Sequence, residues 1–112
     1  MEETKNLYGK FVGEKVLIRT YSAGVHFGKL VERAGKEALL KNARRIHFWK
    51  GAASLSQLAM EGVKDDSRIS VKVNEIVLTE VIEIIPLTKA ALLNLKKQGE
   101  WRVNEDGEVV NK

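Results

Sequence analysis

The fold is decided between residues 15 and 41, where the chain reads KVLIRTYSAGVHFGKLVERAGKEALLK. Residues 15–21 are mainly apolar and β-branched, and residues 25–33 alternate with a period of two, so both stretches predict strands. Turn signals with glycine follow each of them, Ser22-Ala23-Gly24 and Arg33-Ala34-Gly35-Lys36. A third strand begins at Glu37. Three strands joined by short turns predict an antiparallel meander.

The third strand is expected to continue beyond this stretch and to lead into a helix. We predict a bulge near Asn42-Ala43, after which the strand resumes from Arg45 to Trp49. Ser54 and Gln57 then stand at the spacing of a capping box, in which each side chain satisfies a backbone N–H of the other residue. They predict a short helix that ends at Gly62, because glycine readily takes the conformation of a helix stop.

Two more strands and a second helix are expected in the rest of the chain. Residues 69–74 alternate between apolar and polar and predict a fourth strand. Residues 76–85 are strongly β-branched and predict a fifth, central strand, which Pro86 ends because proline has no N–H to donate. Thr88 caps a helix that stops by Gly99. The tail is charged, and we expect Trp101 to anchor it on the core.

These elements predict a mainly β protein of the α+β kind. We expect a small antiparallel β-barrel or a curved five-stranded sheet, with a short helix between strands three and four and a C-terminal helix. A length of 112 residues suits one domain. Its parts would be an N-terminal arm (1–11), a β core (12–86) that holds the helix at 54–62, a C-terminal helix (87–98) and a tail (99–112). An unclosed edge would favour self-association.

Composition excludes several classes of protein. The chain has no cysteine, which rules out disulfide scaffolds, thiolate metal sites and cysteine nucleophiles. We find no secretory signal and no apolar stretch long enough to span a bilayer, so an intracellular compartment is expected. The net charge of +4 comes from 19 Lys and Arg against 15 Asp and Glu. Because both signs are spread along the chain, this charge predicts a solvated surface of mixed sign.

The sequence shows no catalytic motif. A Walker-type loop and the GxGxxG, GxSxG and HExxH patterns are all missing. The chain has two histidines, His26 and His47, and a metal site needs three or four ligands. We therefore expect a protein that is not an enzyme and that uses neither a metal nor another cofactor.

Residues suited to ligand binding concentrate in the first hairpin, between Arg19 and Gly28. Arginine and hydroxyl groups donate hydrogen bonds to anionic oxygens, aromatic rings offer stacking faces, and glycine lets a ligand approach the backbone. The candidates are Arg19, Tyr21, Ser22, Gly24, His26 and Phe27. The alternative is a plain structural hairpin, which also needs a glycine turn and packs its aromatic side chains on the sheet.

A second group of candidates lies on the third strand and at the start of the first helix: Arg44, Arg45, His47, Trp49, Ser54 and Ser56. In a regular strand Arg45, His47 and Trp49 share one face. The helix start beyond them favours anions. A cation, an aromatic ring and a helix start together suit a phosphate joined to a base or sugar. The alternative is a surface strand whose arginines pair with glutamates and whose Trp49 packs under the helix.

Magnitudes limit what one such site can bind. One arginine contact contributes roughly 1.5–3 kcal/mol, and one stacked base contributes roughly 1–3 kcal/mol. Nanomolar capture needs about 12 kcal/mol. A tight site would need further donors, which a pocket across a homo-oligomer interface can supply. We therefore expect the chain to form a homo-oligomer.

Three segments carry a resemblance to a known group of proteins. RTYSAGVHFGKL (19–30), NARRIHFWKGAASLSQLA (42–59) and LTEVIEIIP (78–86) resemble a family of small tailed-phage and prophage proteins that has no assigned chemistry. The resemblance covers residues 16–86. It implies a phage accessory protein made in the cytoplasm of the bacterial host. It also implies an anti-defence role, since some small phage proteins are sponges that sequester cyclic nucleotides or ADP-ribose derivatives used as immune signals.

Three functions follow from these observations. The first is a phage accessory protein that binds and sequesters a phosphorylated, nucleotide-like small molecule without chemistry. The second is a nucleic-acid-binding accessory protein, whose basic and aromatic residues would follow a single strand. The third is an inhibitor that binds a host protein through a sheet edge or an aromatic patch. None of them involves a membrane.

Overall fold

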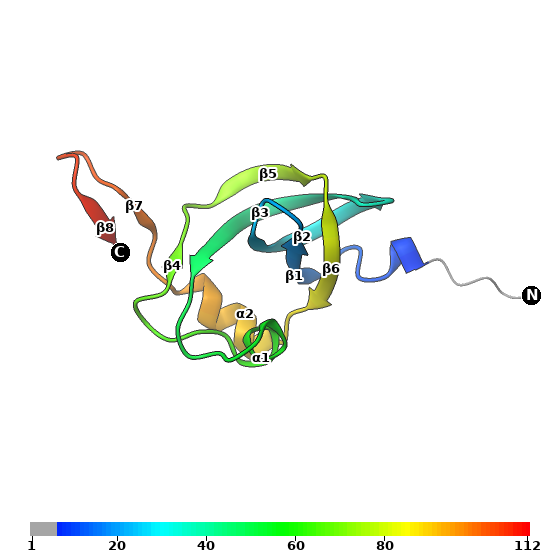
Figure 1. The fold of residues 1–112 in the computed structure, drawn as a ribbon, viewed down its shortest axis with the longest axis horizontal. Coiled ribbons are helices and arrows are strands. Elements are labelled where there is room, and N and C mark those ends of the chain that lie inside the picture. Colours follow the sequence, from blue (N-terminus) through cyan, green and yellow to red (C-terminus); the bar gives the residue numbers. More distant parts are fainter. Residues whose placement is uncertain (1–6) are drawn as a thin grey trace, which may run out of the picture.

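The computed structural model describes residues 7–112, and strands make up most of it (Figure 1). The elements are η1 (Leu7–Gly9), β1 (Lys15–Thr20), β2 (Val25–Ala34), β3 (Glu37–Phe48), α1 (Leu55–Glu61), β4 (Arg68–Ile69), β5 (Val73–Leu78), β6 (Val81–Pro86), α2 (Lys89–Lys96), β7 (Trp101–Val103) and β8 (Val109–Asn111). The expectation of a mainly β protein is confirmed. As expected, one short helix, α1, follows the third strand, and a second helix, α2, follows the last strand of the main sheet. Among the described residues, neither α-helix is long and apolar enough to cross a membrane.

Strands β1, β2 and β3 form the predicted meander, and the remaining strands of the sheet are added at its edges. The order across the sheet is β4-β3-β2-β1-β6, and β5 also pairs with β3. β3 has 12 residues, enough for β5 to pair along its first half and β4 at its end. All these pairings are antiparallel. In the part of the chain described, no pairing joins β5 to β6, so the sheet is open and the predicted barrel does not close.

The predicted bulge near Asn42-Ala43 is confirmed, and it accounts for Gly28. Asn42 has a φ of 53°, and the register between β2 and β3 shifts opposite it. The two strands approach so closely here that a Cβ on Gly28 would lie 3.0 Å from the Cα of Ala43. Strand packing alone therefore explains why glycine stands at this position.

The prediction of single strands over 69–74 and 76–85 is wrong. The chain forms β4, β5 and β6 instead, and it reverses direction at Thr79-Glu80. No glycine, asparagine or proline marks a turn in this β-branched run. Contacts with distant residues hold the reversal: the N–H of Tyr21 donates to the carbonyl of Glu80 at 2.9 Å, and the N–H of Val81 donates to that of Lys36 at 2.9 Å.

Helix α1 begins and ends where its caps predict. The Ser54 hydroxyl accepts a hydrogen bond from the N–H of Gln57 at 3.1 Å, and the Gln57 side chain accepts one from the N–H of Ala53 at 2.8 Å. Gly62 ends the helix with a φ of 86°. A Cβ at this position would also lie 2.3 Å from the side-chain oxygen of Asn94 on α2. Glycine is thus required here both by the backbone and by the neighbouring helix.

Helix α2 is capped by Thr88, as predicted, and the same residue joins the two helices. Its hydroxyl accepts a hydrogen bond from the N–H of Ala91 at 3.1 Å and donates one to the carbonyl of Met60 at 2.6 Å. The Asn94 side chain makes a second link, because it bonds both the N–H and the carbonyl of Val63 at 2.8 and 2.9 Å. The two helices therefore pack against one face of the sheet as a pair (Figure 1).

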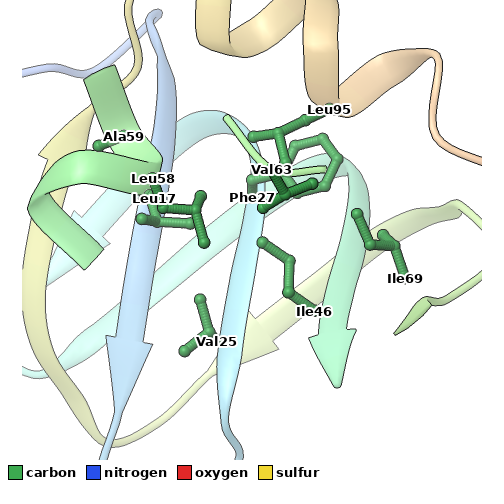
Figure 2. Close-up of a cluster of buried hydrophobic side chains, with 9 residues drawn as sticks. All are labelled: Leu17, Val25, Phe27, Ile46, Leu58, Ala59, Val63, Ile69 and Leu95. Atoms are coloured by element: carbon green, nitrogen blue, oxygen red, sulfur yellow. The ribbon is translucent and has the colours of Figure 1, made fainter. Parts of the chain in front are cut away.

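Two clusters of buried side chains lie on opposite faces of the sheet. Val16, Leu17 and Ile18 are all fully buried, and because side chains alternate along a strand, β1 supplies both clusters. The cluster beneath the helices contains Leu17, Val25, Phe27, Ile46, Leu58, Ala59, Val63, Ile69 and Leu95 (Figure 2). The cluster on the other face contains Val16, Ile18, Leu30, Ala38, Leu40, Ala43, Leu78 and Val81.

The two ends of the chain differ from their predictions. Residues 1–6 of the expected arm lie outside the described residues, and Phe11 packs on the second cluster. The expected charged tail is a hairpin of β7 and β8, which stands away from the main sheet (Figure 1). Trp101 contacts the body of the protein through the ring of His47 at 5.2 Å between centroids, but it packs against neither core cluster, so the predicted anchoring on the core is wrong.

Candidate functional site

Arg44 was expected to bind a ligand, but the structure gives it another role. Its side chain is buried beside the end of α2. Its donors bond the carbonyls of Ser70, Leu95, Gln98, Ile69 and Gly99 at 2.7, 3.2, 3.1, 3.4 and 2.7 Å. A guanidinium has five N–H groups, so all of them are used. Burial lowers the pKa of Arg44, and nearby Glu100 opposes this shift. Arg44 therefore holds backbone segments together, and its role in ligand binding stays a prediction.

The exposed residues of the first hairpin do not gather around a common cavity with the third strand. Arg19 lies 3.9 Å from the carboxylate of Glu83. Tyr21 is 78% exposed, and the Ser22 hydroxyl donates to the carboxylate of Glu80. Gly24 takes a φ of 82° in the turn. These positions fit the alternative of a structural hairpin, and their role in binding stays a prediction.

Phe27 and Trp49 belong to the core beneath the helices. Phe27 is 3% exposed, and Trp49 packs against the same cluster while its ring N–H donates to the carbonyl of Ala52 at 3.2 Å. β3 ends at Phe48, so the strand alternation that would have placed Trp49 beside Arg45 and His47 stops one residue too early. The prediction of a shared face is wrong for Trp49, and the alternative of packing under the helix is correct.

The two serines expected at the start of α1 have separate places. Ser54 is the helix cap, and its oxygen is already bonded to the N–H of Gln57. Ser56 is exposed on the surface of the helix. α1 has only seven residues, so its dipole is a weak support for an anion site. Neither serine lines the two cavities described below.

His26, Arg45 and His47 come together in the structure. They line a cavity of about 150 Å³, which we call the histidine cavity; Ala43, Arg44, Ser70, Val73 and Ile76 complete its wall. His26 lies directly opposite Arg45 in the pairing of β2 with β3. It is 1% exposed, and its Nε2 is 2.9 Å from the carbonyl of Ala23. Burial lowers the pKa of His26 below 6.5, and the charges of Arg45 and His47 act in the same direction.

A larger cavity of about 340 Å³ lies on the face of the sheet that carries α2. We call it the lysine cavity. It is lined by Lys15, Phe27, Gly28, Asn42, Arg44, Lys72, Leu92, Lys96, Gln98 and Glu100. Phe27 and Leu92 provide apolar surface, Asn42 and Gln98 provide amide groups, and the lysines provide positive charge. Its volume falls within the roughly 300–1,000 Å³ that is usual for small-molecule sites.

The lysine cavity carries unneutralised positive charge. Within residues 7–112, no carboxylate forms an ion pair with Lys15, Lys72 or Lys96. Glu100 also lines the cavity, but its carboxylate is bonded to Arg102 at 2.8 Å. Further positive charge lies nearby, because Lys29 is directly opposite both Lys15 and Lys41 across neighbouring strands. Like charges placed opposite one another are destabilising, and a bound anion would relieve this repulsion.

The sequence offered no local signal for the lysine cavity. Its residues come from three strands, the linker before β5, α2 and the segment after α2, so they are far apart in the chain. Lys96 stands in the last turn of a helix, where a lysine is favoured by the helix dipole alone. Lys72 stands in an alternating stretch, where it suits a wet strand face. Only the packing of α2 beside the bulge in β3 brings these side chains together.

The structure thus defines a class of protein: a small, open, antiparallel β domain with two cationic cavities. Among the described residues, no group of three or more His, Asp or Glu side chains is placed to hold a metal ion. Residues 13–95 match the model of the family described as a domain of unknown function, DUF6948, and the chain belongs to this family. A search of curated proteins and a search of solved structures each found no match.

The family match covers the elements from β1 to the last turn of α2. Lys15, Lys72 and the three basic residues of the histidine cavity lie inside the matched range. Lys96, Gln98 and Glu100 lie just beyond it, as does the hairpin of β7 and β8.

Proposed function

We propose that this protein binds a phosphorylated, nucleotide-like small molecule in the lysine cavity and holds it without chemical change. The observation that carries the proposal is the convergence of Lys15, Lys72 and Lys96, none with a carboxylate partner among the described residues, beside the apolar surface of Leu92. Lysine ammonium groups bind phosphate as point charges. The apolar surface can receive a base or a sugar, and the amides of Asn42 and Gln98 can bond its polar edge.

The energies predict weak binding by a single copy. A lysine–phosphate contact contributes roughly 1.5–3 kcal/mol, but ordering a long side chain costs up to about 2 kcal/mol. Burying roughly 100 Å² of a base adds about 2.5 kcal/mol. With one lysine contact these terms sum to roughly 2–5.5 kcal/mol, and the two other lysines can bring the total to the roughly 4–8 kcal/mol that corresponds to millimolar to micromolar dissociation constants.

Tighter capture requires donors from a second copy, so we propose that the protein acts as a homo-oligomer. Two features support self-association. β5 and β6 are edge strands of an open sheet, and such edges can pair with another chain. Both edges also present large apolar side chains: Val77 is 59% exposed and Ile82 is 50% exposed.

Capture without chemistry is what a molecular sponge does. The resemblance to small phage proteins supplies a biological setting for the proposal, namely the cytoplasm of a bacterial host. There the protein would remove a cyclic nucleotide or an ADP-ribose derivative that signals infection, and so act against host defence. The setting is supported by the resemblance, and the binding site is supported by the cavity.

The test is calorimetry at low ionic strength with a panel of cyclic dinucleotides, cyclic ADP-ribose isomers and AMP. We expect saturable heat with at least one of them, and about tenfold weaker binding in Lys72→Gln and Lys96→Gln, the loss of roughly 1.4 kcal/mol. The matched control is Lys97→Gln, which removes the neighbouring lysine at the end of α2 that does not line the cavity. This control should bind like the unchanged protein.

Two results would contradict the proposal. One is the absence of saturable heat with every ligand when protein at about 100 μM is titrated with ligand up to about 10 mM, above the weaker end of the expected range. The other is binding that is weakened equally by Lys96→Gln and Lys97→Gln, because that would show a general effect of net charge.

Nucleic-acid binding is the second candidate, and one observation favours it. Lys15, Lys29 and Lys41 stand in one row across three neighbouring strands, and only Lys41 has a carboxylate partner among the described residues, Glu75 at 3.7 Å. Such a row could follow a phosphate backbone. Binding to a single strand would tighten with strand length and weaken steeply with salt, whereas capture of a small molecule has no dependence on length.

A further inference from the structure

The histidine cavity contains a cation that has no partner. The side chain of Arg45 forms no hydrogen bond or ion pair within residues 7–112, although it is partly buried. Only its backbone is engaged, through the N–H that donates to the Ser70 hydroxyl at 2.8 Å. The contrast with Arg44, the preceding residue, is complete, because Arg44 uses every donor on protein carbonyls. The guanidinium of Arg45 is therefore free to donate to a ligand.

Two imidazoles stand beside this guanidinium. His26 reaches the carbonyl of Ala23 with Nε2, and in that bond the nitrogen acts as the donor, which leaves Nδ1 for another partner. His47 lines the same cavity and is held by the ring of Trp101. When protonated, each ring offers N–H donors on both nitrogens. Strand pairing and the contact with Trp101 hold these donors in place.

The rest of the wall provides nothing to neutralise these groups. Ala43, Val73 and Ile76 are apolar, and the Ser70 hydroxyl already donates to the carbonyl of Val71 at 2.9 Å. No aspartate or glutamate lines the cavity. A cluster of three basic side chains without a carboxylate favours an anion and disfavours a metal cation.

The size of the cavity limits what this anion can be. An engineered protein cavity of about 150 Å³ accommodates benzene, a molecule of six heavy atoms. The histidine cavity is about 150 Å³. A tetrahedral oxyanion with five heavy atoms fits this space, whereas a whole nucleotide does not. Arginine suits such a ligand because its planar fork donates two parallel bonds to phosphate oxygens.

We propose that the histidine cavity is a phosphate site, in which Arg45 binds the oxyanion and His26 and His47 donate to its remaining oxygens. The phosphate can be free in solution or the end of a larger molecule whose remainder lies outside. This site uses none of the lysines of the lysine cavity, so it can be tested independently of the proposed function.

Phosphate binding and protonation are coupled in this arrangement. The charged groups that face His26 are Arg45 and His47 of β3, and β1 places the apolar Ile18 opposite it. Burial and the charges of these two neighbours lower the pKa of the imidazole below 6.5, while the hydrogen bond with the carbonyl of Ala23 acts in the opposite direction. An oxyanion favours the protonated ring and opposes that shift. Bound phosphate is therefore expected to raise the pKa of His26.

The test uses the two imidazoles as reporters, since His26 and His47 are the only histidines of the chain. Their proton NMR signals are followed while inorganic phosphate is added at constant ionic strength, and the signals are titrated with pH both with and without phosphate. We expect both signals to shift saturably and the pKa of His26 to rise. Arg45→Gln should weaken the binding at least about tenfold. Arg33→Gln, which removes an arginine outside the cavity, should leave it unchanged.

Further arms of the experiment separate the sources of phosphate and check the fold. Tighter binding of AMP than of inorganic phosphate, with the same loss in Arg45→Gln, assigns the site to the phosphate of a larger molecule. Equal binding assigns it to free phosphate. Arg45→Lys keeps the charge but loses the fork, and it should bind with intermediate affinity. The unfolding midpoint of each variant shows that it is folded.

Two outcomes would overturn the proposal. One is the absence of any saturable shift up to about 20 mM phosphate, beyond the weakest useful affinity. The other is a shift that survives Arg45→Gln. If that shift is lost in Lys96→Gln instead, phosphate binds in the lysine cavity, and the proposed function gains support while the histidine cavity does not.

Discussion

Arg44 and Arg45 are adjacent in the sequence and have different surroundings in space. Because side chains alternate along a strand, the Arg44 side chain lies on the face that carries α2. There it donates to carbonyls at the end of that helix, which have no partner within the helix. Arg45 points to the opposite face and lines the histidine cavity. A positive charge at a helix C-terminus is also favoured by the helix dipole. The same residue type is thus structural at one position and available for binding at the next.

The stability of the protein is expected to depend strongly on Arg44. In Arg44→Lys the ammonium offers three donors where the guanidinium offers five, and it cannot reach carbonyls on both sides at once. We expect the free energy of unfolding to fall by about 2–4 kcal/mol, since buried carbonyls lose charged donors. Urea denaturation measures this change. The matched variant Arg45→Lys should change stability by less than about 0.5 kcal/mol, and similar losses at both positions would contradict the assigned roles.

At the scale of elements, α1 and α2 are too short to be stable alone. They have seven and eight residues, whereas isolated helices in water need roughly 12–15. Each is fixed by a cap and by its packing on Leu17, Phe27 and their neighbours in the core (Figure 2). Thr88 and Asn94 add direct bonds between the helices. The position of Lys96 at the lysine cavity depends on this pairing.

The two caps should therefore differ in their effect on stability. Ser54→Ala removes one exposed capping bond and should cost about 1 kcal/mol. Thr88→Ala removes a capping bond and also the bond to the carbonyl of Met60, so it should cost about 1 kcal/mol more. Thermal and urea unfolding of both variants give these values. An equal loss in the two variants would show that the bond between the helices contributes nothing.

At the scale of the whole molecule, the hairpin of β7 and β8 is attached to the body by few contacts. Trp101 meets His47 and lies under Arg68 at 5.4 Å, and the Asn111 side chain donates to the carbonyl of Ser67 at 2.9 Å. The backbone N–H of Lys112 reaches the carbonyl of Glu100 at 3.2 Å. Residues 101–112 also lie outside the range of the family match. The hairpin is thus an addition to a sheet that has its own two clusters.

A chain that ends after Glu100 is expected to fold. It keeps Gly99, whose carbonyl binds Arg44, and loses one ring pair, one cation–π contact and the bond of Asn111. These contribute about 0.5–1.5, 0.5–1 and 0.5–1.5 kcal/mol. We expect a single cooperative unfolding transition with a free energy of unfolding lower by about 1.5–4 kcal/mol, on the same three magnitudes. Loss of the cooperative transition would show that the hairpin is part of the core.

Charge is also arranged at this scale. The net charge of +4 is modest, and the sequence spreads it evenly. Folding concentrates part of it, because the pairing of β1, β2 and β3 places Lys15, Lys29 and Lys41 in one row. Of these three lysines, only Lys41 has a carboxylate partner among the described residues, Glu75, while Glu100 is paired with Arg102.

The sequence by itself determined what depends on neighbours in the chain. The meander, the bulge at Asn42 and both helix caps follow from alternation, turn residues and capping side chains, and these act over a few residues. It also placed Arg45 and His47 on one face of the third strand, because side chains alternate along a strand. The hairpin of β7 and β8 also has a local signal, because Asp106-Gly107 between valines is typical of a hairpin turn. The prediction of a charged tail did not use this signal.

Only the tertiary structure decided the remaining features, because they depend on groups that are distant in the chain. The turn at Thr79-Glu80 is held by Tyr21 and Lys36, and no residue within it marks it. Arg44 is structural because α2 ends beside it. The lysine cavity exists because α2 packs next to the bulge and brings Lys96 toward Lys15 and Lys72. Local sequence patterns predict individual strands and helices. Cavities form where such elements pack together, and the periodicity of a sequence gives no signal for contacts between distant elements.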